Sequence, residues 1–324
     1  MIYFDHFATT PCSQEVVDQL CQYLQKDFGN SGSSYALGQR ARRAVEGARA
    51  ALAELLSLPH RSLCFTSGAT EANNLLIQGL TTTKPQLRVI SQQTEHPAVL
   101  APLARFARQG GSVELLPVGA DGRVDPACVE ETLRSSKAPT MVCLMQVNNE
   151  LGVCQPIEEV GALCQKYEAL FHIDGAQAVG KVRCDPSAAG ASSFALSAHK
   201  FYGPKGIGAL YVRRDVEAQI EPLFVGGGQE RGLRPGTAPV HQIVGLGAAA
   251  VCASRALNEG IEEILSARLT LLLEGLRTRL PSLQENGASA PRVPGGAHFT
   301  LSASDAEDLE EAWLGEVAFS RGAA

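Results

Sequence analysis

The sequence predicts an α/β fold in which a mostly parallel β-sheet is flanked by helices. Short apolar runs alternate with stretches of helical periodicity through most of the chain, as in β–α–β units. The remainder is an Ala- and Leu-rich helical stretch followed by short elements, which indicates a smaller α+β domain. We expect a large domain at 13–243 and an incomplete small domain made of 1–12 and 244–324.

The large domain contains seven apolar runs that are short enough to be strands. They are 63–66, 88–91, 113–116, 141–147, 171–174, 193–197 and 209–212. The intervening segments have helical periodicity, and the expected helices are 15–27, 36–56, 70–79, 97–109, 126–134 and 157–168.

A helical pattern over 240–280, which is either one bent helix or two, would connect the large domain to the smaller one. Residues 281–296 have the composition of a loop, and 298–302 of a strand. Ser304 and Glu307 have capping-box spacing, which predicts a helix that reaches about Phe319. The first seven residues are expected to form a strand.

Composition narrows the function classes. The chain has 324 residues, 45% hydrophobic and 19% charged, which is typical of a soluble globular protein. A net charge of −6 and a pI near 5.7 argue against binding of nucleic acid or an anionic membrane. No run of about 18 apolar residues predicts a membrane span, and the N-terminus does not have the pattern of a secretory signal.

The nine cysteines are scattered and contain no C-x-x-C pair. This spacing supports neither a zinc cluster nor a redox pair, so no metal site is expected. Unpaired cysteines fit a reducing compartment, and we expect a cytoplasmic protein. Cys64 and Cys143 lie inside apolar runs and are expected to be core residues.

Polar side chains gather where two neighbouring strands end. Asp174 ends one apolar run with Gln177 just beyond it, and the next run ends in Ser197, His199 and Lys200. Ligands of open α/β sheets bind beyond the carboxyl ends of the strands. A lysine there can form an imine with a cofactor aldehyde, and an aspartate can pair with a pyridinium nitrogen. These residues predict a site for pyridoxal 5'-phosphate (PLP).

Each residue by itself also has an ordinary interpretation. Asp174 could pair with a structural cation, and most lysines are solvated surface groups. The turn before Thr70 opens a helix, so it could bind an anion or be a plain helix start. His96 could stack on a planar ring or cap the next helix, and Asn149 could orient a substrate or form a turn.

Several motifs occur together in one order. They are Ala8–Thr10, Gly29-Asn30, Thr66–Glu71, Thr94–His96, Val147–Gly152, Asp174–Gln177, Ser197–Gly206 and Gly226–Arg231. In this order they closely resemble the cysteine desulfurases, PLP enzymes of the class V aminotransferase family. The resemblance covers Tyr3 to about Leu280 and extends more weakly to Ala324. It implies the PLP-dependent transferase fold, as in aspartate aminotransferase.

The resemblance also implies residue roles. Lys200 would hold PLP covalently, Asp174 would keep the pyridine nitrogen protonated, Gln177 would bind the ring hydroxyl, and His96 would stack on the ring. Lys200 and His96 would be the catalytic residues. The full cofactor-binding set would be Ala69, Thr70, His96, Asn149, Asp174, Gln177, Ser197, His199, Lys200 and Thr237.

Within that set, Thr70, Ser197 and His199 would bind the phosphate. Asn149 would lie beside the ring and the incoming amino acid. Thr237 resembles the position that reaches the phosphate of the partner subunit's cofactor, which implies a homodimer.

The implied reaction converts L-cysteine to L-alanine. The sulfur passes to an enzyme cysteine as a persulfide, for iron–sulfur cluster or thiocofactor synthesis, with a sulfur-acceptor or scaffold protein as partner. In the family this cysteine ends a Ser-x-Gly-x-Ala-Cys type motif. Residues 318–324 match the approach to that motif, so we expect a C-terminally shortened chain in which the cysteine and a substrate-carboxylate arginine fall beyond Ala324.

Three alternatives remain open at this point. The first is a shortened desulfurase. The second is a PLP-dependent lyase or aminotransferase that needs no thiol. The third is a non-catalytic PLP-fold protein that serves as a partner in sulfur transfer.

Overall fold

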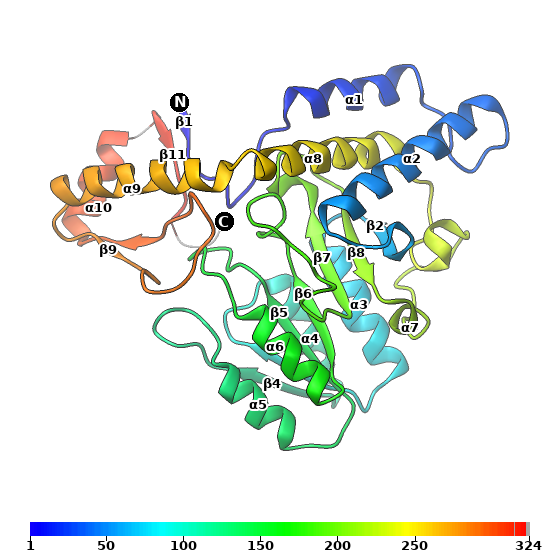
Figure 1. Ribbon diagram of the computed structural model, residues 1–324, viewed down its shortest axis with the longest axis horizontal. Coiled ribbons are helices and arrows are strands. Elements are labelled where there is room, and N and C mark those ends of the chain that lie inside the picture. Colours follow the sequence, from blue (N-terminus) through cyan, green and yellow to red (C-terminus); the bar gives the residue numbers. More distant parts are fainter. Residues whose placement is uncertain (314, 322–324) are drawn as a thin grey trace.

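A seven-stranded mixed sheet forms the centre of the protein in the computed structural model, which describes residues 1–313 and 315–321 (Figure 1). Its order is β2-β8-β7-β6-β5-β3-β4. The strands are β2 (Leu63–Thr66), β3 (Arg88–Gln92), β4 (Ser112–Leu116), β5 (Thr140–Met145), β6 (Leu170–Asp174), β7 (Ser193–Ser197) and β8 (Gly208–Val212). Strand β8 runs opposite to the other six strands, so its pairings with β2 and β7 are antiparallel and the remaining pairings are parallel. The prediction of a mostly parallel sheet is confirmed, and each predicted strand coincides with an observed one.

Helices cover both faces of this sheet because its strands are apolar on both sides. Successive strand residues alternate between two cores: Cys64 joins one and Phe65 the other, as do Val89 and Ile90. The helices are α1 (Gln14–Gln25), α2 (Ala36–Leu55), α3 (Ala69–Thr83), α4 (Pro97–Arg108), α5 (Pro126–Arg134), α6 (Ile157–Lys166), the short α7 (Arg214–Glu217) and α8 (Val240–Asn258). Helices α3 and α4 pack on one face, and α2, α5, α6 and α8 on the other.

Helix α8 is long and apolar enough, by length and composition alone, to cross a membrane. In this fold it is a core helix that packs against α1 and α2. Its small residues permit close approach: a Cβ added at Gly247 would lie 2.6 Å from Cα of Ala48. Burial against neighbouring helices therefore accounts for its apolar composition.

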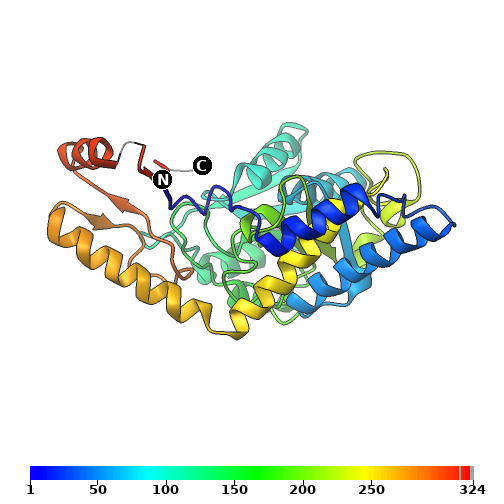
Figure 2. The same cartoon turned by 90° about the horizontal axis from the view of Figure 1, so that it is seen from above.

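The helical stretch at 240–280 forms two helices, α8 and α9 (Ile261–Arg279), which meet at an angle in Figure 2. The break lies at Gly260, whose φ of 77° is in the left-handed region. Beyond α9 come two short antiparallel strands, β9 (Gln284–Glu285) and β10 (Phe299–Thr300), and helix α10 (Ala303–Trp313). The predicted domain boundary at 243/244 falls inside α8 and stays a prediction.

Two predictions for the C-terminal part were wrong. The Oγ of Ser302, not of Ser304, accepts the Asp305 N–H at 3.2 Å, because the helix begins two residues earlier than the capping-box spacing suggested. The helix ends at Trp313 and not near Phe319. Gly315, with φ 77°, turns the chain into β11 (Val317–Ala318), which pairs in parallel with β1 (Ile2–Tyr3).

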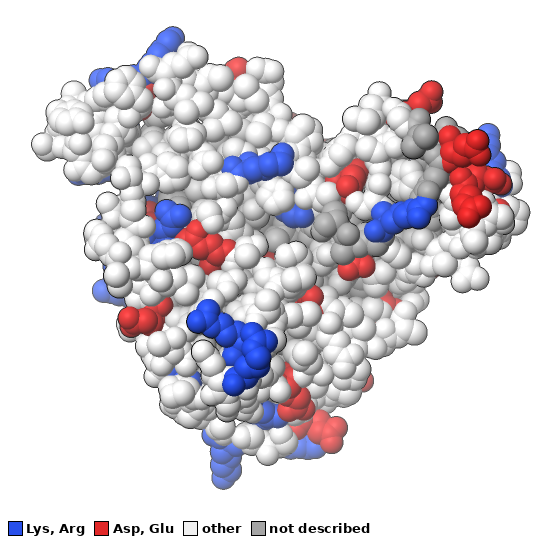
Figure 3. Space-filling model, turned by 180° about the vertical axis from the view of Figure 1, so that it is seen from behind, with Lys and Arg blue, Asp and Glu red and all other residues white. Residues whose placement is uncertain are grey.

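Charge is dispersed on the face of the molecule that Figure 3 shows. Basic and acidic side chains are interspersed there, and most of the visible atoms belong to other residues. This face therefore carries no extended field of one sign.

Candidate active site

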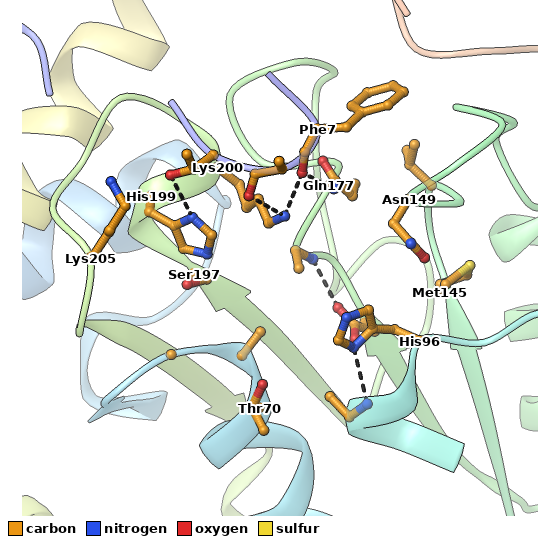
Figure 4. A pocket seen from close by; sticks show the side chains of 18 of the residues that line it. Phe7, Thr70, His96, Met145, Asn149, Gln177, Ser197, His199, Lys200 and Lys205 are labelled. Atoms are coloured by element: carbon orange, nitrogen blue, oxygen red, sulfur yellow. Dashed lines mark hydrogen bonds between the residues drawn. The ribbon is translucent and has the colours of Figure 1, made fainter. Parts of the chain in front are cut away.

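A cavity of about 510 Å³ lies beyond the carboxyl ends of β5, β6 and β7 (Figure 4). Its walls come from the N-terminal segment, the turn before α3, the start of α4 and the segments that follow the three strands. Its lining residues are Phe7, Ala8, Thr9, Ser67, Gly68, Ala69, Thr70, His96, Ala98, Met145, Val147, Asn149, Asp174, Ala176, Gln177, Ser197, His199, Lys200, Lys205 and Gly206. Parallel strands end at one edge of a sheet, which is why segments so far apart in sequence meet here.

The structure brings nine of the ten predicted cofactor-binding residues together on this wall. They are Ala69, Thr70, His96, Asn149, Asp174, Gln177, Ser197, His199 and Lys200. Thr237 is the exception: it is exposed, in the loop between η3 (Gln229–Gly232) and α8, and does not line this cavity. Its predicted role concerns a partner subunit and stays a prediction.

The turn between β2 and α3 presents donors to one end of the cavity. Gly68 has φ 153°, which a side chain would disfavour, and α3 begins at the next residue. The hydroxyls of Thr70 and Ser197 hydrogen-bond to no other described residue. Unpaired hydroxyls beside a helix N-terminus form a site suited to an anionic group.

The N-terminal segment is fixed to the turn that carries the lysine. The Thr10 hydroxyl donates to the His199 carbonyl at 2.9 Å and accepts the Tyr202 N–H at 2.6 Å. The His199 ring contacts the Thr9 hydroxyl through Nδ1 at 3.1 Å, and burial lowers the pKa of this histidine to about 4. A neutral imidazole therefore lies beside the proposed phosphate end of the cavity.

Lys200 lies in η2 (Ala198–Lys200), directly after β7. Its Nζ donates to the carbonyl of Phe7 at 2.5 Å and to that of Ala8 at 3.0 Å. Burial lowers the pKa of this ammonium group, and the charges of Asp174 and Asp5 oppose the shift in part. The shift increases the fraction of neutral amine, the form that attacks a carbonyl carbon.

Asp174 ends β6 on the cavity wall and is 5% exposed. Its Oδ1 accepts the Ala176 N–H at 3.0 Å, and its Oδ2 accepts Nδ2 of Asn73 at 2.7 Å. Burial raises the pKa of this carboxyl, and these two hydrogen bonds lower it in part. Two neutral N–H donors therefore hold this carboxylate, where the sequence had left a structural cation as the alternative partner.

His96 combines the two functions that the sequence left open. It is the N-cap of α4, where its Nδ1 accepts the Ala98 N–H at 3.0 Å, and its ring also lines the cavity. Burial lowers its pKa, so the neutral ring carries its proton on Nε2. The capping bond thus fixes the tautomer that faces the site.

The two adjacent asparagines have separate positions. Asn148 is the turn former, because its Oδ1 accepts the backbone N–H of Glu150 at 3.0 Å and of Leu151 at 2.9 Å. Asn149 lines the cavity, and its amide has no hydrogen-bond partner within the described ranges. That amide is free to contact a bound molecule.

Sequence reasoning missed two residues around Gln177. The carbonyl of Phe7 accepts Nε2 of Gln177 at 2.9 Å, and Lys181 donates to Oε1 of Gln177 at 2.5 Å. Lys181 also lies 4.9 Å from the centroid of the Phe7 ring, and burial lowers its pKa to about 7. The spacing of four from Gln177 was a weak signal for Lys181. Phe7 contacts Gln177 through its backbone carbonyl, which every residue has, so no sequence pattern indicated this contact.

The donor set fits PLP group by group. An amine, a buried carboxylate and a cluster of hydroxyls at a helix N-terminus match an aldehyde, a ring nitrogen and a phosphate. The cavity volume is in the range of ordinary ligand sites. None of the nine cysteines is among the lining residues of the described cavity, and Cys64 and Cys143 are core residues, as predicted.

Comparison with known proteins places these residues in a family. The family Aminotransferase class-V matches residues 2–318. The mitochondrial cysteine desulfurase of Drosophila melanogaster is 41% identical over 329 residues, covering 100% of this chain and 70% of that protein. The cysteine desulfurase IscS of Anaeromyxobacter is 41% identical over 326 residues, covering 100% and 80%.

A solved structure, "SspA in complex with cysteine", superposes with a TM-score of 0.87 at 31% identity, covering 100% of this chain and 90% of that one. The PLP-dependent transferase fold implied by the sequence is therefore confirmed. The chain belongs to the class-V aminotransferase family, among its cysteine desulfurases.

Proposed function

We propose that this protein is a PLP-dependent cysteine desulfurase that converts L-cysteine to L-alanine and passes the sulfur to a thiol. The observation that carries the proposal is the convergence of Lys200, Asp174 and the Thr70 and Ser197 hydroxyls on one cavity. Family membership supports it. So does a related structure that is described as a complex with cysteine.

Each residue has a distinct task in this cavity. Bound PLP supplies a ring that withdraws electrons from Cα of the amino acid. Lys200 would hold the cofactor through its amine, and the same amine would move the proton at Cα of the amino acid. Asp174 would hold a proton on the ring nitrogen, and Thr70 and Ser197 would bind the phosphate. His96 exchanges a proton through Nε2 at the cavity wall.

The sulfur transfer balances without an added oxidant. The acceptor thiolate attacks the substrate sulfur, a sulfur–sulfur bond forms, and the carbon–sulfur bond breaks. The electron pair stays with carbon, which takes a proton and becomes the methyl group of alanine. The acceptor is oxidised to a persulfide. Because no cysteine lines the described cavity, the accepting thiol reaches it from elsewhere.

The experiment uses protein reconstituted with PLP and supplied with L-cysteine and dithiothreitol. Alanine and sulfide should form in equal amounts, and Lys200→Ala should abolish both along with the visible cofactor absorbance. Lys84→Ala, at the half-buried C-cap of α3 and outside the lining of the cavity, is the matched control and should behave as wild type. Pyruvate as the main product, or a colourless wild-type protein, would contradict the proposal.

We also propose that the protein acts as a homodimer. Phe28, Tyr35, Phe224 and Val225 are exposed, with Val225 92% accessible. The loops that carry them lie at the same end of the molecule in Figures 1 and 2. Exposed apolar side chains gathered in this way are typical of an interface. The same end holds the loop of Thr237, which the family resemblance assigns to the partner's cofactor.

Hybrid dimers test this arrangement. A Thr237→Ala dimer should bind PLP weakly, whereas a hybrid of one Thr237→Ala and one Lys200→Ala subunit should recover one site of wild-type affinity. The Thr237→Ala subunit of the hybrid would receive the threonine of its partner. A hybrid as weak as the Thr237→Ala dimer would contradict the shared site, and a monomer in sedimentation would contradict the dimer.

A further inference from the structure

A row of buried side chains leads away from the cavity behind Asp174. Oδ2 of Asp174 accepts Nδ2 of Asn73 at 2.7 Å, and Oδ1 of Asn73 lies 2.8 Å from Nε2 of His172. Nδ1 of His172 lies 2.9 Å from Oγ of Ser193. None of these four residues is more than 5% exposed. Only Asp174 lines the cavity, so the other three have no direct contact with a molecule bound there.

The hydrogen bonds of this row run in one direction. Asn73 must turn its amide N–H towards the Asp174 carboxylate, so its carbonyl oxygen faces His172. That oxygen only accepts, and Nε2 of His172 must therefore carry a proton. Burial lowers the pKa of His172 to about 3, so the ring is neutral and its Nδ1 accepts from the Ser193 hydroxyl. Every donor in the row points towards Asp174.

The fold fixes this row through regular elements. His172 and Asp174 are two residues apart on β6, so their side chains leave the same face of the sheet. Asn73 approaches them from the first turns of α3, and Ser193 is the register partner of His172 on β7. Three elements thus hold Asp174 from behind, and one of them, α3, also carries Thr70 at the cavity.

We infer that Asn73, His172 and Ser193 are positioning residues that keep Asp174 ionised and fixed in orientation towards the ring nitrogen of the cofactor. The inference rests on the proposed PLP site and goes beyond it, because these three residues touch neither cofactor nor substrate. An aligned chain of donors polarises along its length, which strengthens the last hydrogen bond onto the carboxylate.

A second buried carboxyl, that of Glu95, shows how such a group behaves without this row of hydrogen bonds behind it. Glu95 also lies close to Asp174, and burial raises its pKa to about 8. Its Oε1 accepts from Met145 N–H and Gln92, but its Oε2 has no partner among the described residues. That oxygen is the place for a proton, so Glu95 is neutral near pH 7.

Asp174 differs because both of its oxygens accept a hydrogen bond. The other charged or titratable groups that act on it are His96 and Lys200. His96 is neutral near pH 7, and Lys200 no longer carries a free ammonium group once it holds the cofactor. The donors behind Asp174 are therefore the groups that remain to hold its negative charge in the loaded site.

The test measures the ring nitrogen directly. Holoprotein is reconstituted with PLP labelled with ¹⁵N in the ring, and the ¹⁵N chemical shift is followed from pH 6 to 10. In wild type the ring nitrogen should stay protonated to high pH. His172→Phe and Asn73→Leu should each lower the midpoint of its deprotonation by ~1 pH unit or more, because the last donor is weakened or removed. Ser193→Ala should lower it by less.

Two further variants distinguish this role from a purely structural one. His172→Gln retains an N–H donor for Asn73 and should restore most of the midpoint. Ser192→Ala is the matched control, because Ser192 is an equally buried neighbour whose Oγ accepts the Phe171 N–H at 3.1 Å outside the row. It should lower the melting temperature and leave the midpoint unchanged.

The inference is overturned if the variants bind PLP with the wild-type ¹⁵N midpoint, whatever happens to their melting temperatures. It is also overturned if Ser192→Ala shifts the midpoint as much as His172→Phe. A wild-type protein that binds no PLP would instead overturn the proposed function itself, so the two failures are distinguishable.

Discussion

Nζ of Lys200 lies 2.5 Å from the backbone carbonyl oxygen of Phe7, a residue 193 positions earlier in the chain. The contact joins the N-terminal segment to the end of β7 and closes one side of the cavity. It also shows that the amine is held by oxygen atoms that carry no charge of their own, so burial dominates its pKa. The chemistry of the site thus depends on how the whole fold encloses Lys200.

The phosphate end of the cavity can be tested without a catalytic assay. Thr70→Val and Ser197→Ala should each weaken PLP binding about tenfold, since a hydrogen bond to a charged group contributes ~1.5–3 kcal/mol. Neither should weaken binding of pyridoxal, which has no phosphate. Fluorescence titration with both compounds measures the difference. Thr82→Val, exposed near the other end of α3, is the control, and an equal loss for both compounds would contradict the assignment.

The Gly68 turn should be sensitive to a methyl group on the neighbouring strand. A Cβ at Gly208 would lie 2.3 Å from the Leu196 carbonyl oxygen and 2.6 Å from Cα of Gly68. Gly208→Ala should therefore weaken PLP binding by more than tenfold and cost ~1–3 kcal/mol of unfolding free energy. Gly47→Ala, where a Cβ meets nothing within 4 Å in α2, should instead stabilise by ~0.5–1 kcal/mol in urea unfolding. Wild-type PLP affinity in Gly208→Ala would contradict the expected steric clash with the Gly68 turn.

A buried ion pair anchors the loop that leads to Thr237. Arg49 and Glu230 are joined by two contacts, at 2.8 and 2.9 Å, and Glu230 also accepts the Phe65 N–H at 2.9 Å. Glu230→Ala should lower the free energy of unfolding by ~3–5 kcal/mol, because it leaves the buried Arg49 guanidinium with only the exposed Glu46, at 3.4 Å, as an ion-pair partner. Arg40→Ala removes the exposed pair with Asp27 and should cost much less. Similar losses in urea unfolding for the two variants would contradict the burial argument.

Lys181 should make stability depend on pH. Its folded pKa of about 7 lies below that of an unfolded lysine, so the unfolded chain binds more protons between these values. The contribution of Lys181 to stability therefore rises with pH across that window. Lys181→Met should be more stable than wild type near pH 7, and the advantage should shrink as the pH approaches 10. Urea unfolding at several pH values measures it. A difference that does not change with pH would exclude the titration.

The sequence predicted the sheet and most of the cavity because both depend on short, continuous segments of the chain. Apolar runs mark the strands, and the side chains at the ends of β6 and β7 carry their chemistry with them. The same local logic placed Thr70 at a helix start and His96 before another.

What the sequence could not predict depends on contacts between distant segments. Strand β1 lies within the predicted N-terminal strand but is only two residues long, and its partner β11 is too short for a periodic signal, so their pairing was not predicted. Phe7 acts through its backbone carbonyl, which any residue possesses. Asn73 and His172 look like ordinary members of a helix and a strand until the fold places them behind Asp174.

Reductive trapping tests the central claim most directly. Wild-type protein is loaded with PLP, reduced with sodium borohydride, digested and mapped by mass spectrometry. The pyridoxyl group should be found on Lys200 alone, although Lys205 lines the same cavity and Lys181 lies beside Gln177. A label on Lys181 or Lys205, or on no lysine at all, would contradict the assignment of this cavity as a PLP site built around Lys200.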